Sequence, residues 1–578
     1  MSKPTSFTRR LDLFRFLKQT HASSHYSHSQ QLPPISSSSS ISTAQTKCQI
    51  YVLGNPSADL DSIISAIIYS YFATRVISAS PASVTSSSGR EGGENILRQY
   101  IPLIDLPDVH AGKELARLRP EFVTALRLAV GWDEGRVSGN EYHAENSLEN
   151  SVLTVADLKE RLVELDRTTA SSGRGKETEA PNTRNYEEAA SKSSNHIADG
   201  QKNLNIMMVD WNALPKLPPK GEKRGIEGLS DALPGLKISV VGCIDHHDDE
   251  FFVSRESDSH PYDPRCIQTG VGSCTSLVVR ELRAQGLWLD DVSCSSDPTT
   301  TTMVAETRED QTAIYEAQVA KLAMAAILID TANMTAKSKV SAVDTAVVAF
   351  LEAKIRAGIK AHFRSNPQFA TGGADWDRQS FYDAIALVKE NSVENLTVQE
   401  VLGRDYKEWT ETVTTKTTSS GTNSNTTMKL GICCMVKPLS WLVEKCIRES
   451  KDVATTPTDT RCTTPLFKYL SSFATEKHLD LVAVMTAFRT PAPKSEFYRE
   501  LLLYSLNREC LPGVESFEAA AAGELGLEEG VWIGDFALTG GTGDNNGCYK
   551  RVWKQIDVSK SRKQVAPLLR GALCGSAD

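Results

Sequence analysis

Side chains that could bind a cation or move a proton follow several short apolar runs of this sequence. They are Asn55, Asp59, Asp61, Asp210, Asp245, His246, His247 and Asp330. Carboxylates that converge from separate segments repel one another unless cations lie among them. Oxygen ligands with one or two imidazoles suit Mg²⁺, Mn²⁺ or Co²⁺ better than a metal that prefers thiolates. The pattern therefore predicts a divalent metal site whose ions can activate water.

Each of these residues by itself has a simpler explanation. An aspartate directly after a strand most often caps the next helix, which would account for Asp59 or Asp61. Asp210 could be a turn residue, and the adjacent His246 and His247 could be a hydrogen-bonded structural pair. Their order along the chain and their shared position after apolar runs favour cation binding over separate coincidences.

The elements that must position these residues can be read from the apolar pattern. Three runs are predicted to be buried strands: Cys48–Leu53, Asn205–Val209 and Ile238–Ile244. A helix is expected from about Ser62, because apolar residues recur there at helical spacing. Strands that alternate with helices indicate an α/β fold with a mostly parallel sheet. Loops at the carboxyl ends of such strands share one crevice, so we expect the candidate residues to meet there.

The chain has 578 residues, too many for one compact core. We expect an amphipathic segment with a Ser-rich linker at 1–47, a metal-binding domain at 48–363, a linker at 364–377 and a smaller C-terminal α/β domain at 378–578 that closes over the cleft. Four low-complexity stretches are predicted to be surface loops: 78–95, 168–201, 293–310 and 412–427.

The composition is that of a soluble globular protein, with 40% hydrophobic and 23% charged residues. The best apolar stretch, Leu322–Ile329, is shorter than the roughly 20 residues that cross a bilayer, so no membrane span is expected. A formal net charge of −9 offers no attraction to polyanions, which argues against a nucleic-acid partner. Metals or a local basic patch must therefore attract any anionic substrate. The acidic surface favours a monomer.

The 12 cysteines are scattered, without a CxxC pair or a secretory signal, which indicates a reducing intracellular compartment. We expect the cytoplasm. The segment SFTRRLDLFRFLKQTHASS is basic, amphipathic and followed by serines, and it leaves two alternatives open. It could be a mitochondrial presequence, or a helix that docks on the first domain.

The candidate residues and the sequence around them are similar to those of a known family. The series Asp59-x-Asp61, Asp210, Asp245-His246-His247 and Asp330 resembles the four motifs of the DHH phosphoesterase superfamily. Within it, the sequence is most similar to the eukaryotic exopolyphosphatase branch, which is related to the manganese-dependent (family II) inorganic pyrophosphatases. Seven stretches carry this similarity: GNPSADLDSI, GCIDHHDDE, TGVGSCTSLV, AAILIDTANM, EVLGRDYKEW, MVKPLSWL and SRKQVAPLL. The resemblance implies hydrolysis of the terminal phosphoanhydride of inorganic polyphosphate, which releases orthophosphate.

The resemblance also implies how the acidic residues would share two divalent metal ions, Mn²⁺, Mg²⁺ or Co²⁺. One ion would be held by Asn55, Asp59 and Asp210, and the other by Asp61, Asp210, His246 and Asp330. A shared carboxylate such as Asp210 can keep two ions about 3.5–4 Å apart. Asp245 would orient a histidine rather than bind metal, and His247 would donate a hydrogen bond to the substrate phosphate. Catalysis is thus expected to involve Asp210, Asp245, His246 and His247.

Positive charge is needed opposite the metals, because the phosphoryl group carries negative oxygens. Candidates are Arg562 and Lys563 in SRKQVAPLL, Lys407 in RDYKEW, and Lys337 after the last motif. Any single lysine or arginine could instead be a solvated surface charge. The similarity of the surrounding motifs favours Arg562 and Lys563 most, Lys407 less and Lys337 least.

Two glycines precede the apolar segment SCTSLVVREL, which is predicted to be a helix. Free amides at its start, after Gly270 and Gly272, could bind a phosphate. Alternatively, the glycines only allow a tight turn.

One departure within the family pattern bears on the substrate. Related pyrophosphatases have a histidine where this chain has Asn55, and the similarity to exopolyphosphatases includes the asparagine. An amide oxygen is a harder and weaker ligand than imidazole, which favours polyphosphate over pyrophosphate and makes Mg²⁺ an acceptable ion. A pyrophosphatase or short-chain polyphosphatase remains the enzyme alternative, and a catalytically silent scaffold the other. A DHH-type nuclease is disfavoured, because LTGGTGDNNG lacks the histidine of the GGGH-like loop of such proteins.

Overall fold

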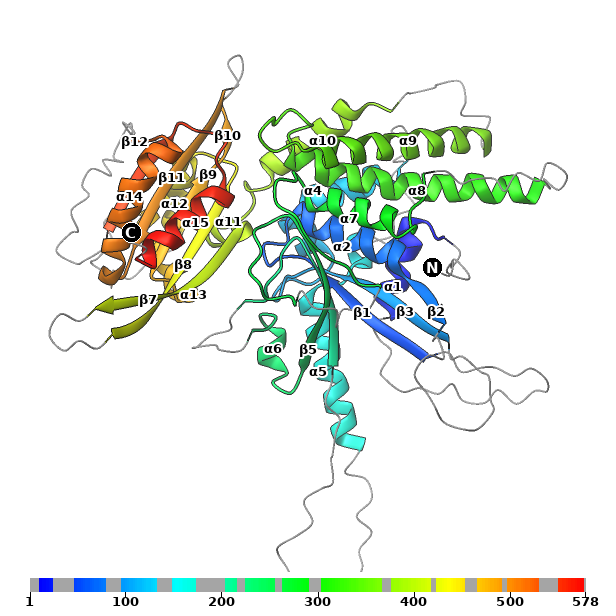
Figure 1. Ribbon diagram of the computed structural model, residues 1–578, viewed down its shortest axis with the longest axis horizontal. Helices are drawn as coiled ribbons and strands as arrows, with labels where there is room; N and C mark the ends of the chain where they lie inside the picture. Colours follow the sequence, from blue (N-terminus) through cyan, green and yellow to red (C-terminus); the bar gives the residue numbers. More distant parts are fainter. Residues whose placement is uncertain are drawn as a thin grey trace, which may run out of the picture.

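The computed structural model shows two lobes, each built on its own sheet (Figure 1). The residues that the structure describes are 10–23, 46–78, 95–131, 148–172, 203–215, 224–254, 262–290, 303–365, 376–416, 423–452, 465–490, 496–529 and 549–575. The segment LTGGTGDNNG and most of the predicted low-complexity loops lie outside these residues.

The first lobe contains a six-stranded sheet in the order β2-β3-β1-β4-β5-β6. Its strands are β1 (Thr46–Leu53), β2 (Arg75–Ser78), β3 (Asn95–Leu103), β4 (Asn203–Val209), β5 (Lys237–Asp245) and β6 (Arg265–Ile267). All neighbours pair in parallel except β2 with β3. The predicted α/β fold with a mostly parallel sheet is confirmed. Strand β3 escaped prediction because polar residues interrupt it, among them Arg98, which is buried in an ion pair with Asp263.

Helices surround this sheet. They are α2 (Leu60–Ala73), α3 (Lys113–Leu118), α4 (Pro120–Val130), α5 (Val155–Ser172), α6 (Leu229–Ala232), α7 (Cys274–Ala284), α8 (Met303–Asp330), α9 (Ala342–Ser365) and α10 (Arg378–Asn391), with the 3-10 turn η2 (Leu148–Ser151). Helix α2 is buried along its whole length between the sheet, α7 and α8. It therefore fixes the loop that precedes it, which carries the first motif.

Helix α8 is longer and more apolar than the sequence estimate allowed. Its part Arg308–Asp330 would be long and apolar enough to cross a membrane, but 72% of its apolar window is buried inside the structure. It packs against α9, α4, α2 and α10, as Figure 1 shows for the long α8–α9 pair. These contacts are those of a core helix.

Helix α1 (Leu13–Ser23) docks on the first lobe. It buries Leu13, Phe16 and Leu17, and the Phe16 ring meets Tyr71 of α2 edge-on, with 5.0 Å between centroids. The backbone amide of Leu13 also donates to Gln318 Oε1 of α8 at 3.1 Å. The described part of this segment is therefore a helix that packs on the first lobe.

The second lobe contains a sheet in the order β12-β13-β11-β9-β8-β7, with β10 paired to β11. Its strands are β7 (Tyr406–Lys416), β8 (Asn423–Met435), β9 (Leu481–Thr486), β10 (Phe488–Arg489), β11 (Phe497–Ser505), β12 (Leu527–Glu529) and β13 (Tyr549–Gln555). Its helices are α11 (Val398–Arg404), α12 (Leu439–Asp452), α13 (Pro465–Lys477), α14 (Leu511–Leu525) and α15 (Arg562–Leu573), with the 3-10 turn η4 (Arg508–Cys510). Among the described strands of this sheet, β8 and β9 are the only parallel neighbours.

The ends of β7 and β8 correct one loop prediction. Residues 412–416 and 423–427, expected in a surface loop, pair with each other as antiparallel strands. The stretch is rich in threonine, whose β-branched side chain favours strands over irregular loops.

The chain enters the second lobe later than its sequence indicates. Helix α10 follows the linker expected at 364–377, but it packs against α4 and α8 of the first lobe. Helix α11 is the first element that packs on the second sheet, through β8. The crossing between the lobes therefore lies between Asn391 and Thr397.

Candidate metal centre

The first motif occupies the loop between β1 and α2. Asp59 is the N-cap of α2, and its side chain accepts a 3.0 Å hydrogen bond from the Ser62 amide. The capping explanation of Asp59 is thus correct, and it leaves carboxylate oxygen available for a cation. Burial would raise the pKa of Asp59, but the Ser62 amide and the charges of Lys407 and Lys389 outweigh this effect and lower it.

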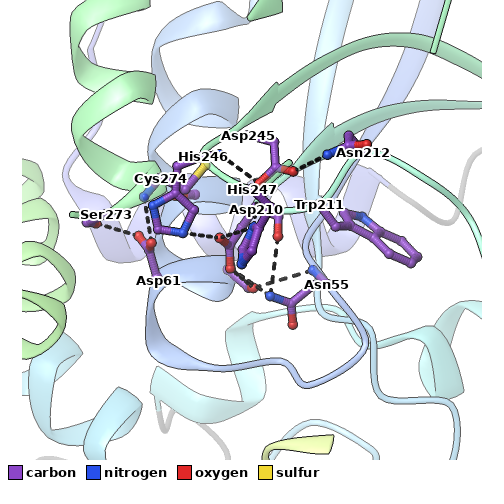
Figure 2. Close-up of polar contacts among 12 residues, drawn as sticks. Asn55, Asp61, Asp210, Trp211, Asn212, Asp245, His246, His247, Ser273 and Cys274 are labelled. Atoms are coloured by element: carbon purple, nitrogen blue, oxygen red, sulfur yellow. Dashed lines mark hydrogen bonds and ion pairs between the residues drawn. The ribbon is translucent and has the colours of Figure 1, made fainter. Parts of the chain in front are cut away.

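Asp210 directly follows β4 and occupies the centre of the cluster (Figure 2). Its backbone has φ of 64°, a conformation that residues other than glycine rarely adopt and that marks local strain. Its Oδ2 accepts two hydrogen bonds of 2.7 Å, from Asn55 Nδ2 and Ser62 Oγ. Its Oδ1 is buried without a hydrogen-bond donor among the described residues. Burial and the charge of Asp59 raise the pKa of Asp210 to about 8.

The side chain of Asn55 is oriented by Ser57. Asn55 Oδ1 accepts from the Ser57 amide at 2.9 Å and from the Ser57 hydroxyl, so the amide nitrogen must face Asp210. An oxygen that already accepts two hydrogen bonds is poorly placed to bind a metal ion. The geometry therefore differs from the ligand role expected for Asn55: this residue holds Asp210 in place.

His246 presents a ring nitrogen to Asp210. Its Nδ1 lies 3.0 Å from the Val271 carbonyl oxygen, which requires a proton on Nδ1 and leaves a lone pair on Nε2. That Nε2 lies 3.2 Å from Asp210 Oδ1 and 3.1 Å from Lys563 Nζ. Burial, with the positive charge of Lys563, lowers the pKa of His246 to about 4. The ring is therefore neutral near pH 7, the form that binds metals.

Asp245 orients the second histidine. Its Oδ1 lies 2.8 Å from His247 Nδ1 and accepts from the His246 amide at 2.7 Å. Its Oδ2 accepts from Asn212 Nδ2 at 2.6 Å, as Figure 2 shows. This arrangement turns His247 Nε2 toward Lys407 Nζ, 3.4 Å away. Burial and the charge of Lys407 lower the pKa of His247 well below its ordinary value.

Asp61 lies in the first turn of α2, and its side chain points to the start of α7 (Figure 2). Its carboxylate accepts from the amides of Cys274 and Thr275 at 2.6 and 2.9 Å, and from the Ser273 hydroxyl at 2.7 Å. The helix amides considered for a phosphate are therefore occupied by a protein carboxylate. Gly272 is required sterically, since a Cβ there would lie 2.7 Å from Thr331 Cγ2. Burial and the charge of Asp210 raise the pKa of Asp61.

Asp330 is the last residue of α8, where the helix dipole disfavours a negative charge. Burial and the charge of Asp61 raise its pKa well above the ordinary value, and Lys389 and Lys339 partly oppose the rise. A bound cation would offset both the dipole and the repulsion between carboxylates.

The candidate basic residues differ in how close their side chains lie to the acidic cluster. Lys563 and Lys407 reach from the second lobe to His246 and His247. Arg562 pairs with Asp405 Oδ1 at 2.8 Å and also donates to the Asp405 carbonyl at 2.9 Å. Lys337 is exposed, and no contact between it and the other candidate residues is found within the described ranges. Lys339 interacts with Asp330 instead.

Several contributors escaped the sequence analysis. Ser62 and Asn212 hold Asp210 and Asp245, while Lys339 and Lys389 supply positive charge. Asn212 lies two residues after the motif residue Asp210 and Ser62 directly follows Asp61, so these two carried a local signal. The others depend on which helices pack together.

The donor set fits divalent cations. Asp210, His246 and His247 offer ligand atoms that all lie within 4.8 Å of one another. A buried carboxylate oxygen without a donor faces the lone pair of a neutral imidazole, and two acceptors in that position repel one another unless a cation or a proton donor lies nearby. Carboxylate oxygens with an imidazole form a donor set that suits divalent cations.

Two family models and a protein of another organism match large parts of this chain. The family model described as the DHH family, N-terminal domain, matches residues 49–327, and that of the DHHA2 domain matches residues 385–572. A protein of Schizosaccharomyces pombe (strain 972 / ATCC 24843) named "Putative exopolyphosphatase" is 24% identical over 522 residues, which are 90% of this chain and 89% of that protein.

Among solved structures, one titled "Crystal structure of Methanococcus jannaschii putative family II inorganic pyrophosphatase" covers 91% of this chain and 100% of its own. The identity is 15% and the TM-score 0.40.

Proposed function

The chain belongs to the DHH phosphoesterase superfamily, and on that premise we propose that it is an exopolyphosphatase that releases orthophosphate from the end of inorganic polyphosphate. Hydrolysis as the reaction is supported by the resemblance of the motifs to those of phosphoesterases. The choice of polyphosphate is supported by the Schizosaccharomyces pombe relative, whose printed name is that activity. The asparagine at position 55 supports it further, because related pyrophosphatases carry histidine there.

Asp59, Asp61, Asp210, His246 and Asp330 would hold two divalent ions, with Asp210 shared between them. When bound, such ions supply Lewis-acid activation of the attacking water and of the phosphoryl oxygens. Asp210 suits the shared position because one of its oxygens is fixed by two hydrogen bonds and the other has no donor within the part of the chain that the structure describes.

The residues of this chain would supply the remaining positive charge and the orientation. Lys563 and Lys407 lie opposite the acidic residues and would contact the oxygens of the terminal phosphate. His247, held by Asp245 through Nδ1, would present Nε2 to the same phosphate. Because both lysines come from the second lobe, the relative position of the lobes would control whether the site is complete.

One observation carries this proposal: a buried cluster of carboxylates and a neutral imidazole from the first lobe meets lysines from the second lobe at 3.1–3.4 Å. Negative groups that bind metal on one side and cations on the other form the arrangement that a metal-bound polyanion needs.

Phosphate release tests the proposal. Chelator-treated protein would receive Mg²⁺, Mn²⁺ or Co²⁺ in turn, with pyrophosphate, tripolyphosphate and long-chain polyphosphate as substrates. We expect no release without metal and the fastest turnover on long chains, with orthophosphate as the released product. Fastest turnover on pyrophosphate would assign a pyrophosphatase instead, and no metal-dependent release from any of the three would overturn the enzymatic assignment.

A further inference from the structure

Arg119 links the first motif loop to the second lobe. It lies between α3 and α4, remote in sequence from every motif, and only 2% of its surface is exposed. Its Nε donates to the Ala58 carbonyl at 2.8 Å and its Nη2 to the Ser57 carbonyl at 2.5 Å. The same Nη2 donates to the Arg404 carbonyl of the second lobe at 2.7 Å.

The two carbonyls of the first lobe belong to the loop that carries Asn55 and Asp59. Ala58, which lies between Asn55 and Asp59, has φ of 43°, so its backbone is strained. Such a conformation persists only where the surroundings determine it. The guanidinium of Arg119 provides that restraint, since its planar fork bonds two consecutive carbonyls at once.

The acceptor in the second lobe, the Arg404 carbonyl, also lies next to residues of the proposed site. Arg404 ends α11 and precedes Asp405, which binds Arg562, and Lys407, which reaches His247. Its side chain is held by both oxygens of Glu121, each at 2.7 Å, two residues beyond Arg119. The end of α11 is therefore anchored next to the guanidinium.

A buried guanidinium is costly unless it forms strong hydrogen bonds. Within the described residues, Arg119 bonds only to carbonyl oxygens, which include Leu118 O at 3.2 Å. An apolar side chain packed at position 119 would avoid the cost of burying a charge. The guanidinium has five N–H donors in one plane and can therefore bind carbonyls of both lobes together.

We propose that Arg119 is a positioning residue that couples the docked position of the second lobe to the conformation of the metal-binding loop 55–59. When the second lobe is docked, the Arg404 carbonyl holds the guanidinium against the Ser57 and Ala58 carbonyls, which places Asp59 for metal binding and Asn55 for its hydrogen bond to Asp210. This role rests on the proposed function of that loop as part of a divalent metal site.

The test measures Mn²⁺ affinity directly, by titration with the electron paramagnetic resonance signal of free Mn²⁺ as readout. The variants are Arg119→Met, Arg404→Met and the double variant. Arg117→Met is the matched control, because Arg117 also links the lobes through Glu400 but does not touch the loop. Thermal unfolding of each metal-free variant reports whether it folds.

We expect Arg119→Met to weaken Mn²⁺ binding on the order of 10- to 100-fold, as loss of a residue behind a metal ligand does. Arg404→Met should weaken it through the same link, so the double variant should be no weaker than Arg119→Met. Arg117→Met should bind as the wild type does. Phosphate release should fall mainly in kcat.

Several outcomes would overturn the proposal. Wild-type Mn²⁺ affinity in Arg119→Met would remove its role at the loop, and additive effects in the double variant would remove the link between the lobes. If Arg119→Met does not fold, Arg119→Lys decides the same question, since one ammonium cannot replace the fork. Absence of Mn²⁺ binding by the wild type would overturn the proposed function, and this role with it.

Discussion

Asn55 Nδ2 donates a 2.7 Å hydrogen bond to Asp210 Oδ2 across 155 positions of the chain. The two residues come from the ends of neighbouring parallel strands, β1 and β4. The bond leaves Asp210 with one fixed oxygen and one oxygen without a donor, which is the state suited to a shared metal ligand.

Substitution of this asparagine should therefore act through Asp210. We expect Asn55→Ala to lower metal-dependent phosphate release by about 10- to 100-fold, because residues that hold a ligand contribute that much. Initial rates at saturating Mn²⁺ measure the effect. Asn203→Ala, which removes an exposed bond to Ser239, is the control and should keep full activity. Equal activity in the two variants would contradict the supporting role of Asn55.

Replacement of Asp210 by a neutral side chain should abolish activity without lowering stability. Asp210→Asn is expected to abolish phosphate release, since a neutral amide is a poor bridge between cations. The metal-free variant should unfold at the same temperature as the wild type or a higher one, because burial and the charge of Asp59 already raise the pKa of Asp210 to about 8. Assays with Mn²⁺ and thermal scans in chelator check the two halves. Retained turnover would show that the shared position belongs to another residue.

Two of the candidate lysines, Lys563 and Lys337, should differ in their effect on activity when substituted. Lys563→Met is expected to raise KM for polyphosphate and to lower kcat, because Lys563 lies 3.1 Å from His246. Lys337→Met should change neither constant, since Lys337 is exposed away from the cluster. Steady-state kinetics on one long-chain substrate compares them. A larger effect at Lys337 would invalidate the placement of the basic side of the site.

Asp105 gives a pH dependence that is independent of the metal centre. Burial, with the charge of Glu227, raises its pKa to about 8. An acid with a folded-state pKa above its unfolded value of about 3.9 loses its contribution to stability as the pH rises through that interval. Asp105→Asn cannot ionise. Its unfolding temperature should therefore exceed that of the wild type by a margin that grows from about pH 4 to about pH 8 and then stays constant.

The control for this measurement is Asp108→Asn, which alters an acid whose side chain is 87% exposed. Its difference from the wild type should not grow over the same range. A constant difference for Asp105→Asn would mean that Asp105 is already ionised in the folded protein.

Helix α1 should contribute to the stability of the first lobe. Leu13 is fully buried against that lobe, so Leu13→Ala should cost about 2–5 kcal/mol, as large-to-small core substitutions do. Denaturant unfolding gives the value. Arg15→Ala, at a side chain that is 74% exposed, should cost little. Equal small losses in both variants would show that the docked helix is dispensable.

Much of the acidic half of the site could be predicted from sequence. Asp59, Asp61 and Asp210 each follow a short apolar run, and parallel strands bring their carboxyl ends to one edge. The basic half was less predictable. Lys563 and Lys407 depended on motif similarity, and Lys339 and Lys389 had no local signal, because a surface lysine and a site lysine look alike in sequence.

The amino-acid sequence by itself determined strands β1, β4 and β5, the helix after the first motif and the acidic residues beside these elements, because apolar periodicity and backbone preference are local properties. Only the tertiary structure decided three contacts. Asn55 holds Asp210, the carboxylate of Asp61 accepts from the first amides of α7, and Arg119 joins the two lobes. Each of these contacts joins segments far apart in the chain. Their partners follow from how helices and lobes pack, which no local pattern encodes.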